Sequence, residues 1–176
     1  MNLLKKQNQN LFKFLILIFF ILSNSAYSEI KFISAHTNQV RVVDGDSLQI
    51  RKEKIRLSGI DAPEINQICY DHNDSPYACG HVAKKKLESF IKDTNYSKIY
   101  CYYSERDKYD RILGECMLGE ESKKNINVYM VFYGYAVAYL RYSEKYLEQQ
   151  EDAKRFKFGL WAGNFDMPED WRKKNK

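Results

Sequence analysis

Short segments of alternating apolar and polar residues constrain the fold of this chain more than any other feature. Between residues 40 and 61, apolar side chains recur at every second position in three runs, which is the period of a half-buried β-strand. Asp44-Gly45 separates the first run from the second, and the charged residues 51–54 separate the second from the third. Pro63 ends the series because proline cannot donate to a strand ladder. The pattern predicts three short strands joined by tight turns.

The rest of the chain adds helical patterns and one further strand pair. Apolar residues at helical spacing predict a helix from Gly80 to about Lys92, and a shorter one is expected over 126–133. The strands are expected at 98–103 and 112–118, around a polar turn, and 65–79 is expected to be a loop. A charged helix is expected from Glu144 to Phe158. Short strands packed with a few helices indicate an α+β fold and are compatible with a small barrel.

Residues 1–28 have the pattern of a secretory signal peptide. They contain no acidic residue, carry Lys5 and Lys6 near the start, and include an unbroken apolar run from Phe14 to Leu22. This run is shorter than the about 20 residues that a membrane span needs. We expect cleavage before Glu29, a single domain over 29–176, a periplasmic or secreted location and no stable membrane insertion afterwards. The alternative is an uncleaved membrane anchor.

The net charge of the expected mature chain points to no particular partner. The whole chain has 28 basic and 23 acidic residues, a formal charge of +5. Loss of residues 1–28 removes three lysines and no acid, which leaves a charge of about +2. A strongly basic surface is typical of nucleic-acid binding, and this chain lacks that overall imbalance. Any such function must therefore rest on a local site.

All four cysteines lie in the expected mature part, which agrees with export into an oxidising compartment. Cys69 and Cys79 flank a polar segment of nine residues, and Cys101 and Cys116 flank the expected strand pair. Of the three possible pairings, we predict 69–79 with 101–116. The alternative is a zinc site, but its spacing matches no common structural zinc pattern. That zinc set would comprise Cys69, His72, Cys79 and His81.

Three clusters of charged residues carry the chemistry that the sequence offers. They occupy residues 44–47, 56–64 and 106–111. Carboxylates at strand ends can bind a hard cation such as Ca²⁺, and paired arginines grip phosphate with forked donors. A further carboxylate beside them can take a proton from water. A metal, a general base and two arginines together indicate cleavage of a phosphodiester.

Each cluster alone also has a purely structural interpretation. Asp44-Gly45 is a common hairpin turn, Arg56 suits a strand surface, and Arg111 suits a solvated turn. A calcium-binding EF-hand loop is excluded at Asp44, because Gln49 stands where the loop needs glycine. The joint occurrence of the three clusters favours the functional interpretation.

These motifs resemble the thermonucleases, the staphylococcal-nuclease-like family. The resemblance rests on Val-Asp-Gly-Asp-Ser at 43–47, Arg-Leu-x-Gly-Ile-Asp-Ala-Pro-Glu at 56–64 and Asp-Lys-Tyr-Asp-Arg at 107–111. It continues through 134–139 and 159–161, and it covers nearly all of residues 38–172 in family order. The segment from Cys69 to Cys79 and the ending from Trp161 through Arg172 resemble the exported, cysteine-containing bacterial branch of the family.

The resemblance implies a five-stranded OB-type β-barrel with three helices and a calcium-dependent endonuclease that hydrolyses DNA and RNA to 3′-phosphate ends. It implies calcium bound by Asp46, Asp61 and the backbone carbonyl of Ala62, with Asp44 just outside these ligands. Glu64 falls on the general-base position. The phosphate-binding positions fall on Arg56 and Arg111.

Two positions depart from the family pattern. Ala62 replaces a threonine of the best-known form, so a carbonyl ligand is kept and a hydroxyl contact is lost. Asp110 replaces the usual glycine before Arg111; Asp tolerates left-handed backbone better than most residues, so the turn can persist. The charge of Asp110 would weaken the attraction for phosphate.

Further expectations concern the aromatic residues and the tail. Tyr109, Tyr139 and Tyr142 could stack on bases or pack within the fold, and we expect Tyr109 and Tyr142 to contact substrate. The basic residues of the tail are expected to form a solvated end: Arg172, Lys173, Lys174 and Lys176. We expect a monomer with nucleic acid as its partner. The alternative functions are a non-catalytic OB-fold module that binds nucleic acid and an envelope protein with an interaction role.

Overall fold

The computed structural model describes residues 29–92, 95–120 and 124–175. The expected signal peptide, residues 1–28, lies outside the described residues. Within the described ranges, no helix has both the length and the apolar character needed to cross a membrane.

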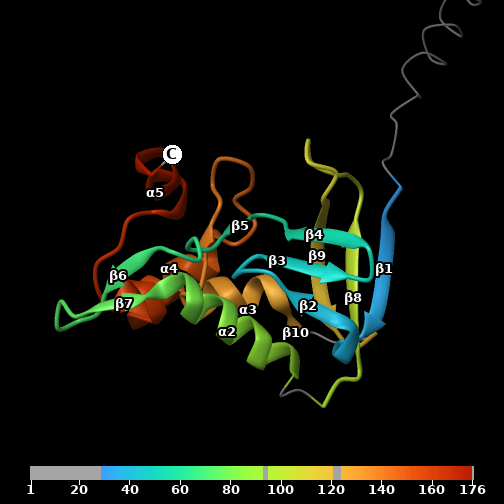
Figure 1. Cartoon of the computed structure of the whole chain (residues 1–176), viewed down its shortest axis with the longest axis horizontal. Helices are drawn as coiled ribbons and strands as arrows, with labels where there is room; N and C mark the ends of the chain where they lie inside the picture. The colour runs from blue at the N-terminus through green and yellow to red at the C-terminus, as the bar shows by residue number, and fades with distance from the viewer. Residues whose placement is uncertain (1–28, 93–94, 121–123, 176) are drawn as a thin grey trace, which may run out of the picture.

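A seven-stranded sheet forms the centre of the fold. Its strands follow the order β1-β8-β9-β4-β3-β2, with β10 paired to β9, and only β4 and β9 run parallel. Figure 1 shows β2, β3 and β4 running crosswise to β1, β8 and β9, so the sheet is sharply bent, as in an OB-type fold. The strands are β1 Lys31–His36, β2 Val40–Val42, β3 Ser47–Ile50, β4 Glu53–Leu57, β8 Lys98–Tyr103, β9 Ile112–Leu118 and β10 Lys124–Asn125.

The period of two predicted from the sequence is seen directly in the burial of these strands. Along β9, buried and partly buried residues alternate without exception, and Ile55 and Leu57 of β4 are completely buried. One face of the sheet therefore lies on the core, while the other carries partly exposed polar residues such as Arg56.

Two smaller sheets attach to this frame. β5 Ile60–Asp61 pairs with β11 Val137–Ala138, and β6 Ile68–Tyr70 pairs with β7 Pro76–Ala78. The prediction of a loop over 65–79 is therefore wrong in part, because a short hairpin forms there. The hairpin is held by the Cys69–Cys79 disulfide and by pairing of Tyr70 with Asn164.

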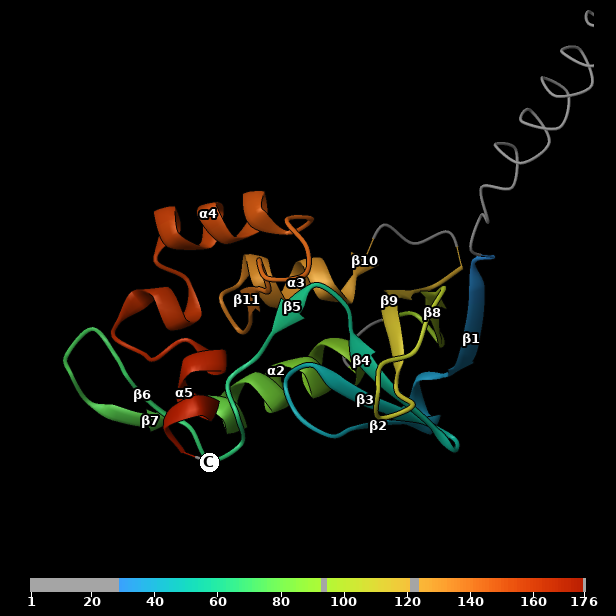
Figure 2. The ribbon, with the colours of Figure 1, turned by 90° about the horizontal axis from the view of Figure 1, so that it is seen from above.

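Four helices of the described residues cover the sheet and its flank. They are α2 Cys79–Lys92, α3 Ile126–Phe132, α4 Leu147–Phe156 and α5 Pro168–Lys174, together with the short 3₁₀ segments η1 Thr37–Gln39 and η2 Gly159–Ala162. Figure 2 shows α3 between α4 and α2, and α5 at the end of the molecule nearest β6 and β7. The expected α+β class is confirmed; the expected counts of five strands and three helices are too low.

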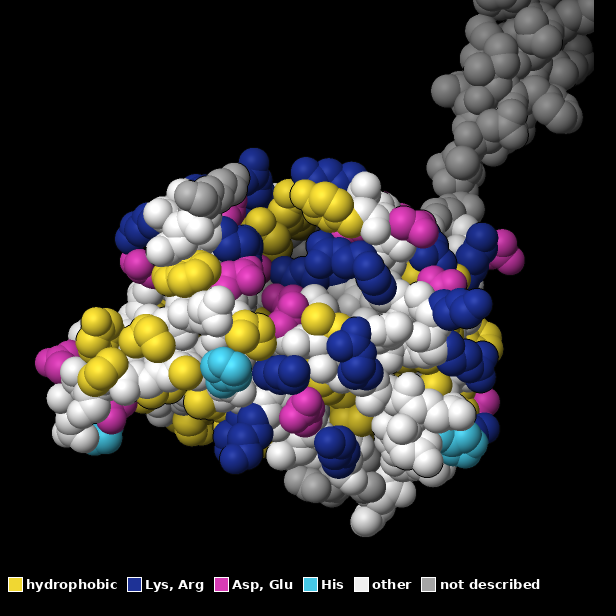
Figure 3. All heavy atoms as spheres, in the orientation of Figure 1, with side chains coloured by type: hydrophobic (Ala, Val, Ile, Leu, Met, Phe, Trp, Pro, Cys, Tyr) yellow, Lys and Arg dark blue, Asp and Glu magenta, His cyan; other side chains and the backbone are white. Residues whose placement is uncertain are grey.

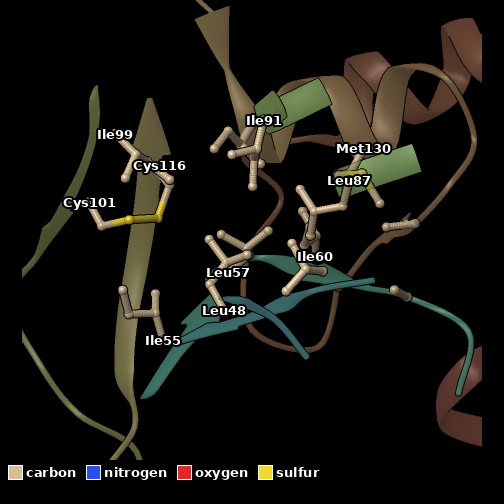
Figure 4. Packing of buried hydrophobic residues seen from close by; sticks show 14 of the residues in the cluster. Leu48, Ile55, Leu57, Ile60, Leu87, Ile91, Ile99, Cys101, Cys116 and Met130 are labelled. Atoms are coloured by element: carbon tan, nitrogen blue, oxygen red, sulfur yellow. A yellow bond between two sulfur atoms is a disulfide. The ribbon is translucent and has the colours of Figure 1, made fainter. Parts of the chain in front are cut away.

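The main core lies between the bent sheet and helices α2 and α3. In Figure 4, Leu48, Leu57 and Ile60 from the strands point toward Leu87 of α2 and Met130 of α3. All of these side chains are buried, and each contributes roughly 1.5–3 kcal/mol when removed from water. A second, smaller cluster surrounds the disulfide of Cys69 and Cys79 and includes Val137 and Leu160.

Both predicted disulfides are present. Cys101 and Cys116 are directly paired residues of β8 and β9, and their bond lies in the main core. Cys69 and Cys79 join β6 to the first residue of α2. No cysteine is free, so the alternative zinc site is excluded.

Candidate functional site

The candidate site begins at the turn between β2 and β3. The Asp46 N–H donates to Oδ1 of Asp44 at 3.0 Å, and the Leu57 N–H donates to the carbonyl oxygen of Asp46 at 2.8 Å. A Cβ at Gly45 would lie only 2.6 Å from Cβ of Ala62 and 2.8 Å from Cβ of Ala83. The turn therefore needs glycine, and the close packing places Asp46 beside the segment that follows β5.

Arg56 joins the two predicted metal-binding carboxylates. Its Nη1 lies 2.6 Å from Oδ2 of Asp46, and its Nη2 donates to Oδ1 of Asp61 at 2.9 Å. The Ala62 N–H donates to the same Asp46 oxygen at 2.6 Å. Asp46 and Asp61 are 6% and 1% exposed, so both charges are held away from water. The structure thus brings together four of the predicted site residues.

Glu64 is anchored by its backbone. Its N–H donates to Oε1 of the buried Gln67 at 3.2 Å, and its carbonyl oxygen accepts from the Gln67 N–H at 2.8 Å. Gly80, in the first turn of α2, packs directly on the same carbonyl, where any Cβ would overlap it. The Glu64 side chain remains 40% exposed, so the backbone of this residue is fixed while its carboxylate is accessible to solvent.

Arg172 of α5 is a residue of this cluster that the sequence interpretation missed. Its Nη1 donates to Oδ1 of Asp61 at 3.0 Å and to Oε1 of Glu64 at 2.9 Å, while Nη2 donates to Oδ2 of Asp61 at 2.9 Å. The prediction that Arg172 belongs to a solvated end is therefore wrong. Figure 3 shows basic and acidic side chains gathered at a hollow on this face of the molecule.

Burial perturbs the acidity of both carboxylates. It raises the pKa of Asp46 to about 7 against the lowering effect of Arg56, and the negative charges of Asp44 and Asp61 raise it further. Burial also raises the pKa of Asp61, while the hydrogen bond from Arg172 and the charge of Arg56 lower it. Buried carboxylates whose negative charge is only partly balanced by nearby positive groups are common in sites that bind cations or catalyse reactions.

The donor chemistry of the cluster fits a hard cation. Asp46 and Asp61 offer carboxylate oxygens, and calcium accepts carboxylates, backbone carbonyls and water together. Among the residues that the structure describes, no group of three or more His, Cys, Asp or Glu side chains gathers closely enough to hold a metal ion. Backbone carbonyls and water would therefore have to complete the coordination of a cation bound here.

Arg111 directly precedes strand β9, which pairs with the strand that carries Arg56. The parallel register pairs Arg56 with Leu113, so Arg111 lies two positions before the residue that faces Arg56. Nε and Nη2 of Arg111 contact Oδ2 of Asp107 at 2.8 and 2.7 Å. Asp110 adopts the left-handed backbone, with φ of 61°, so the turn persists without glycine as expected. Among the described residues, no hydrogen bond or ion pair joins Arg111 to the carboxylate cluster; the two are related through the β4–β9 pairing.

Comparison with known proteins decides the family. The family model described as staphylococcal nuclease homologue matches residues 54–163, more than half of the chain. The chain belongs to the staphylococcal nuclease homologue family. The predicted resemblance is confirmed. Asp46 and Arg172 both lie outside the matched range.

Curated relatives agree with this assignment to the staphylococcal nuclease homologues. An uncharacterized endonuclease of Haemophilus influenzae is 35% identical over 173 residues, covering 92% of this chain and 84% of that protein. An uncharacterized endonuclease of Escherichia coli is 30% identical over 139 residues, covering 76% and 81%. The succinoglycan biosynthesis protein ExoI of Rhizobium meliloti is 31% identical over 126 residues, covering 70% of this chain. The chain spans only 63% of that protein's length.

The tyrosines of this staphylococcal nuclease homologue differ in position. Tyr109 and Tyr142 are 66% and 72% exposed, so both rings are open to a ligand. Tyr139 is partly buried, and its ring meets that of Tyr142 at 4.8 Å. The Tyr139 N–H donates to the carbonyl oxygen of Gly59 at 2.9 Å, and burial and the charge of Asp61 raise the pKa of Tyr139.

Proposed function

We propose that this protein is an exported, calcium-dependent endonuclease that hydrolyses phosphodiester bonds of DNA and RNA and leaves 3′-phosphate ends. The observation that carries the proposal is the contact cluster of Asp46, Arg56, Asp61 and Glu64, in which buried carboxylates and an arginine lie beside a solvent-accessible carboxylate. The names of the endonuclease relatives support the same reaction class. The leader-like residues 1–28 and the disulfides support export.

Each residue has a role in the proposed reaction. Asp46, Asp61 and the carbonyl oxygen of Ala62 would hold calcium, which when bound supplies positive charge for the phosphate oxygens. Glu64 accepts the proton of the attacking water at its carboxylate. Arg56 and Arg111 bind the phosphate and stabilise the negative charge that grows on it.

Three further residues, Asp44, Tyr109 and Tyr142, support the proposed reaction. Asp44 lies behind Asp46 and fixes it by accepting its N–H. The exposed rings of Tyr109 and Tyr142 can stack on bases without sequence preference, which suits a substrate range of both DNA and RNA. We propose that the protein acts as a monomer.

A nuclease assay on single- and double-stranded DNA and RNA tests the proposal. With Ca²⁺ supplied, we expect all substrates to be cleaved and 3′-phosphates to be formed; with excess EDTA, we expect cleavage to stop. Binding of oligonucleotides without cleavage at any Ca²⁺ concentration would instead favour the non-catalytic OB-fold module.

The contact between Gly80 and Glu64 leads to a prediction. Gly80→Ala should push the backbone of Glu64 away and lower turnover roughly 10²-fold, because small displacements of a reacting group have large effects on rate. Gly114→Ala is the matched control, since its added methyl group meets only side chains, with Ile55 at 3.0 Å. Steady-state cleavage and thermal unfolding should be measured for both variants. If Gly80→Ala lost no more activity than Gly114→Ala, the backbone of Glu64 would not need this contact.

The two disulfides are expected to matter differently for activity. The Cys101–Cys116 bond links the strands on either side of the turn that carries Arg111, so its loss should loosen that turn. A bond that closes a loop of this length contributes about 3 kcal/mol in the chain-entropy model. Replacing Cys101 and Cys116 by serine should lower turnover more than replacing Cys69 and Cys79. Cleavage rates below the melting temperature of both double variants check this, and the opposite order would contradict it.

A further inference from the structure

Arg172 connects the C-terminal helix to the centre of the candidate site. Three hydrogen bonds of 2.9–3.0 Å join its guanidinium to Asp61 and Glu64, which are more than 100 residues earlier in the chain. The Asp61 end is fully buried, and the Arg172 side chain is 31% exposed. The contact is therefore a forked, partly buried ion pair rather than a loose surface pair.

This contact uses the oxygens of Asp61 that a cation would need. Oδ1 of Asp61 accepts from Arg56 at 2.9 Å and from Arg172 at 3.0 Å, so both of its lone pairs are engaged. Oδ2 accepts from Arg172 at 2.9 Å. Because a cation binds through the same lone pairs, Arg172 and a cation compete for Asp61.

Charge strengthens the competition. A divalent cation bound to the buried Asp61 would have the positive Arg172 next to it, and like charges repel strongly where burial reduces screening by solvent. Arg172 also holds Glu64, so its fork neutralises the proposed base together with the proposed metal ligand.

We propose that Arg172 is a further residue of this site that sets its affinity for calcium. It is the counter-ion of Asp61 and Glu64 until the cation binds, and it then leaves Asp61 and frees Glu64. The inference rests on the proposed calcium dependence, and it adds a residue that lies beyond the range of the family match.

Helix α5 is built to permit this exchange. It has seven residues, and only Pro168 among them is buried. Apart from the fork of Arg172, an ion pair from α5 to the rest of the described structure joins Glu169 to Arg141, whose side chain is 62% exposed, and such surface pairs contribute little. Release of Arg172 should therefore loosen α5 without opening the core.

Calorimetric titration of Ca²⁺ alone into chelator-treated protein tests the proposal. We expect Arg172→Ala to bind Ca²⁺ at least roughly tenfold more tightly than the parent, because a charged hydrogen-bonded competitor is gone. Arg172→Lys, which keeps the charge and loses the fork, should lie between the two. Lys173→Ala is the matched control, since it removes one charge from the same helix, and the ion pairs of Lys173 within the described residues are with Glu169 and Asp170 rather than with the cluster. Its affinity should equal that of the parent.

Hydrogen exchange on the parent protein provides a second readout that needs no variant. Addition of Ca²⁺ should speed amide exchange in residues 168–174 and leave β9 unchanged. Equal calcium affinities of the parent and Arg172→Ala, or no change of exchange in α5, would overturn the role of Arg172 and leave calcium dependence standing. Failure of the parent and every variant to bind Ca²⁺ would overturn the proposed metal itself, and this inference with it.

Discussion

Replacing Glu64 by glutamine should lower turnover by roughly 10²–10⁴-fold, the usual contribution of a general base. Glutamine keeps the shape of the side chain but cannot accept the proton of water at neutral pH. The backbone contacts to Gln67 and Gly80 do not involve the carboxylate, so the fold around the site should persist. Oligonucleotide affinity should therefore stay close to that of the parent.

A matched control is available for this experiment. Glu53 also has a side chain that is 40% exposed and paired with an arginine, but it lies at the start of β4 and contacts Arg106 rather than the cluster. Glu53→Gln should leave turnover unchanged. Single-turnover cleavage and oligonucleotide binding should be measured for both variants, and turnover of Glu64→Gln within a few-fold of the parent would exclude the base role.

Lysine substitutions of Arg111 and Arg56 should affect turnover and thermal stability differently. Arg111→Lys should lower turnover by roughly 10²–10³-fold, because lysine cannot make the forked contact to a phosphate whose charge is changing. Its melting temperature should change little, since its partner Asp107 also accepts hydrogen bonds from the backbone N–H groups of Tyr109 and Arg111, which lysine leaves in place. Arg56→Lys should lower both turnover and melting temperature, because the buried Asp61 loses a hydrogen-bonded partner.

Arg106 is the matched control for Arg111. It lies in the same turn, its side chain is 34% exposed against 31% for Arg111, and it pairs with Glu53. Arg106→Lys should retain most activity. If lysine at 56 and 111 also retained most activity, the argument from forked phosphate contacts would be wrong.

Much of the candidate site could be predicted because it is local in sequence. Asp46, Arg56, Asp61 and Glu64 lie within one stretch of short strands and turns, so the alternating pattern and Pro63 predicted charged clusters at strand ends. The resemblance to the thermonucleases supplied the role of each residue. The disulfides were also predictable, since each joins neighbouring cysteines across a short segment.

The parts that sequence reasoning missed depend on distant contacts. Arg172 reaches Glu64 across 108 positions, and no local pattern shows where a short helix will dock. The start of α5 did carry a signal, with Pro168 in the first turn followed by Glu169 and Asp170 and then by basic residues. Strand β1 was missed because only one of its six residues, Ala35, is buried, so it lacks a clear apolar alternation.

The disulfide arrangement has a consequence for how the chain is made. Each cysteine is bonded to its nearest cysteine in sequence, with separations of 10 and 15 residues and no crossing of the two loops. Cysteines joined strictly in their order of synthesis therefore reach the native pairing directly, and no incorrect bond has to be broken and exchanged. We expect oxidative refolding to require an oxidant alone and to gain little speed from a disulfide isomerase.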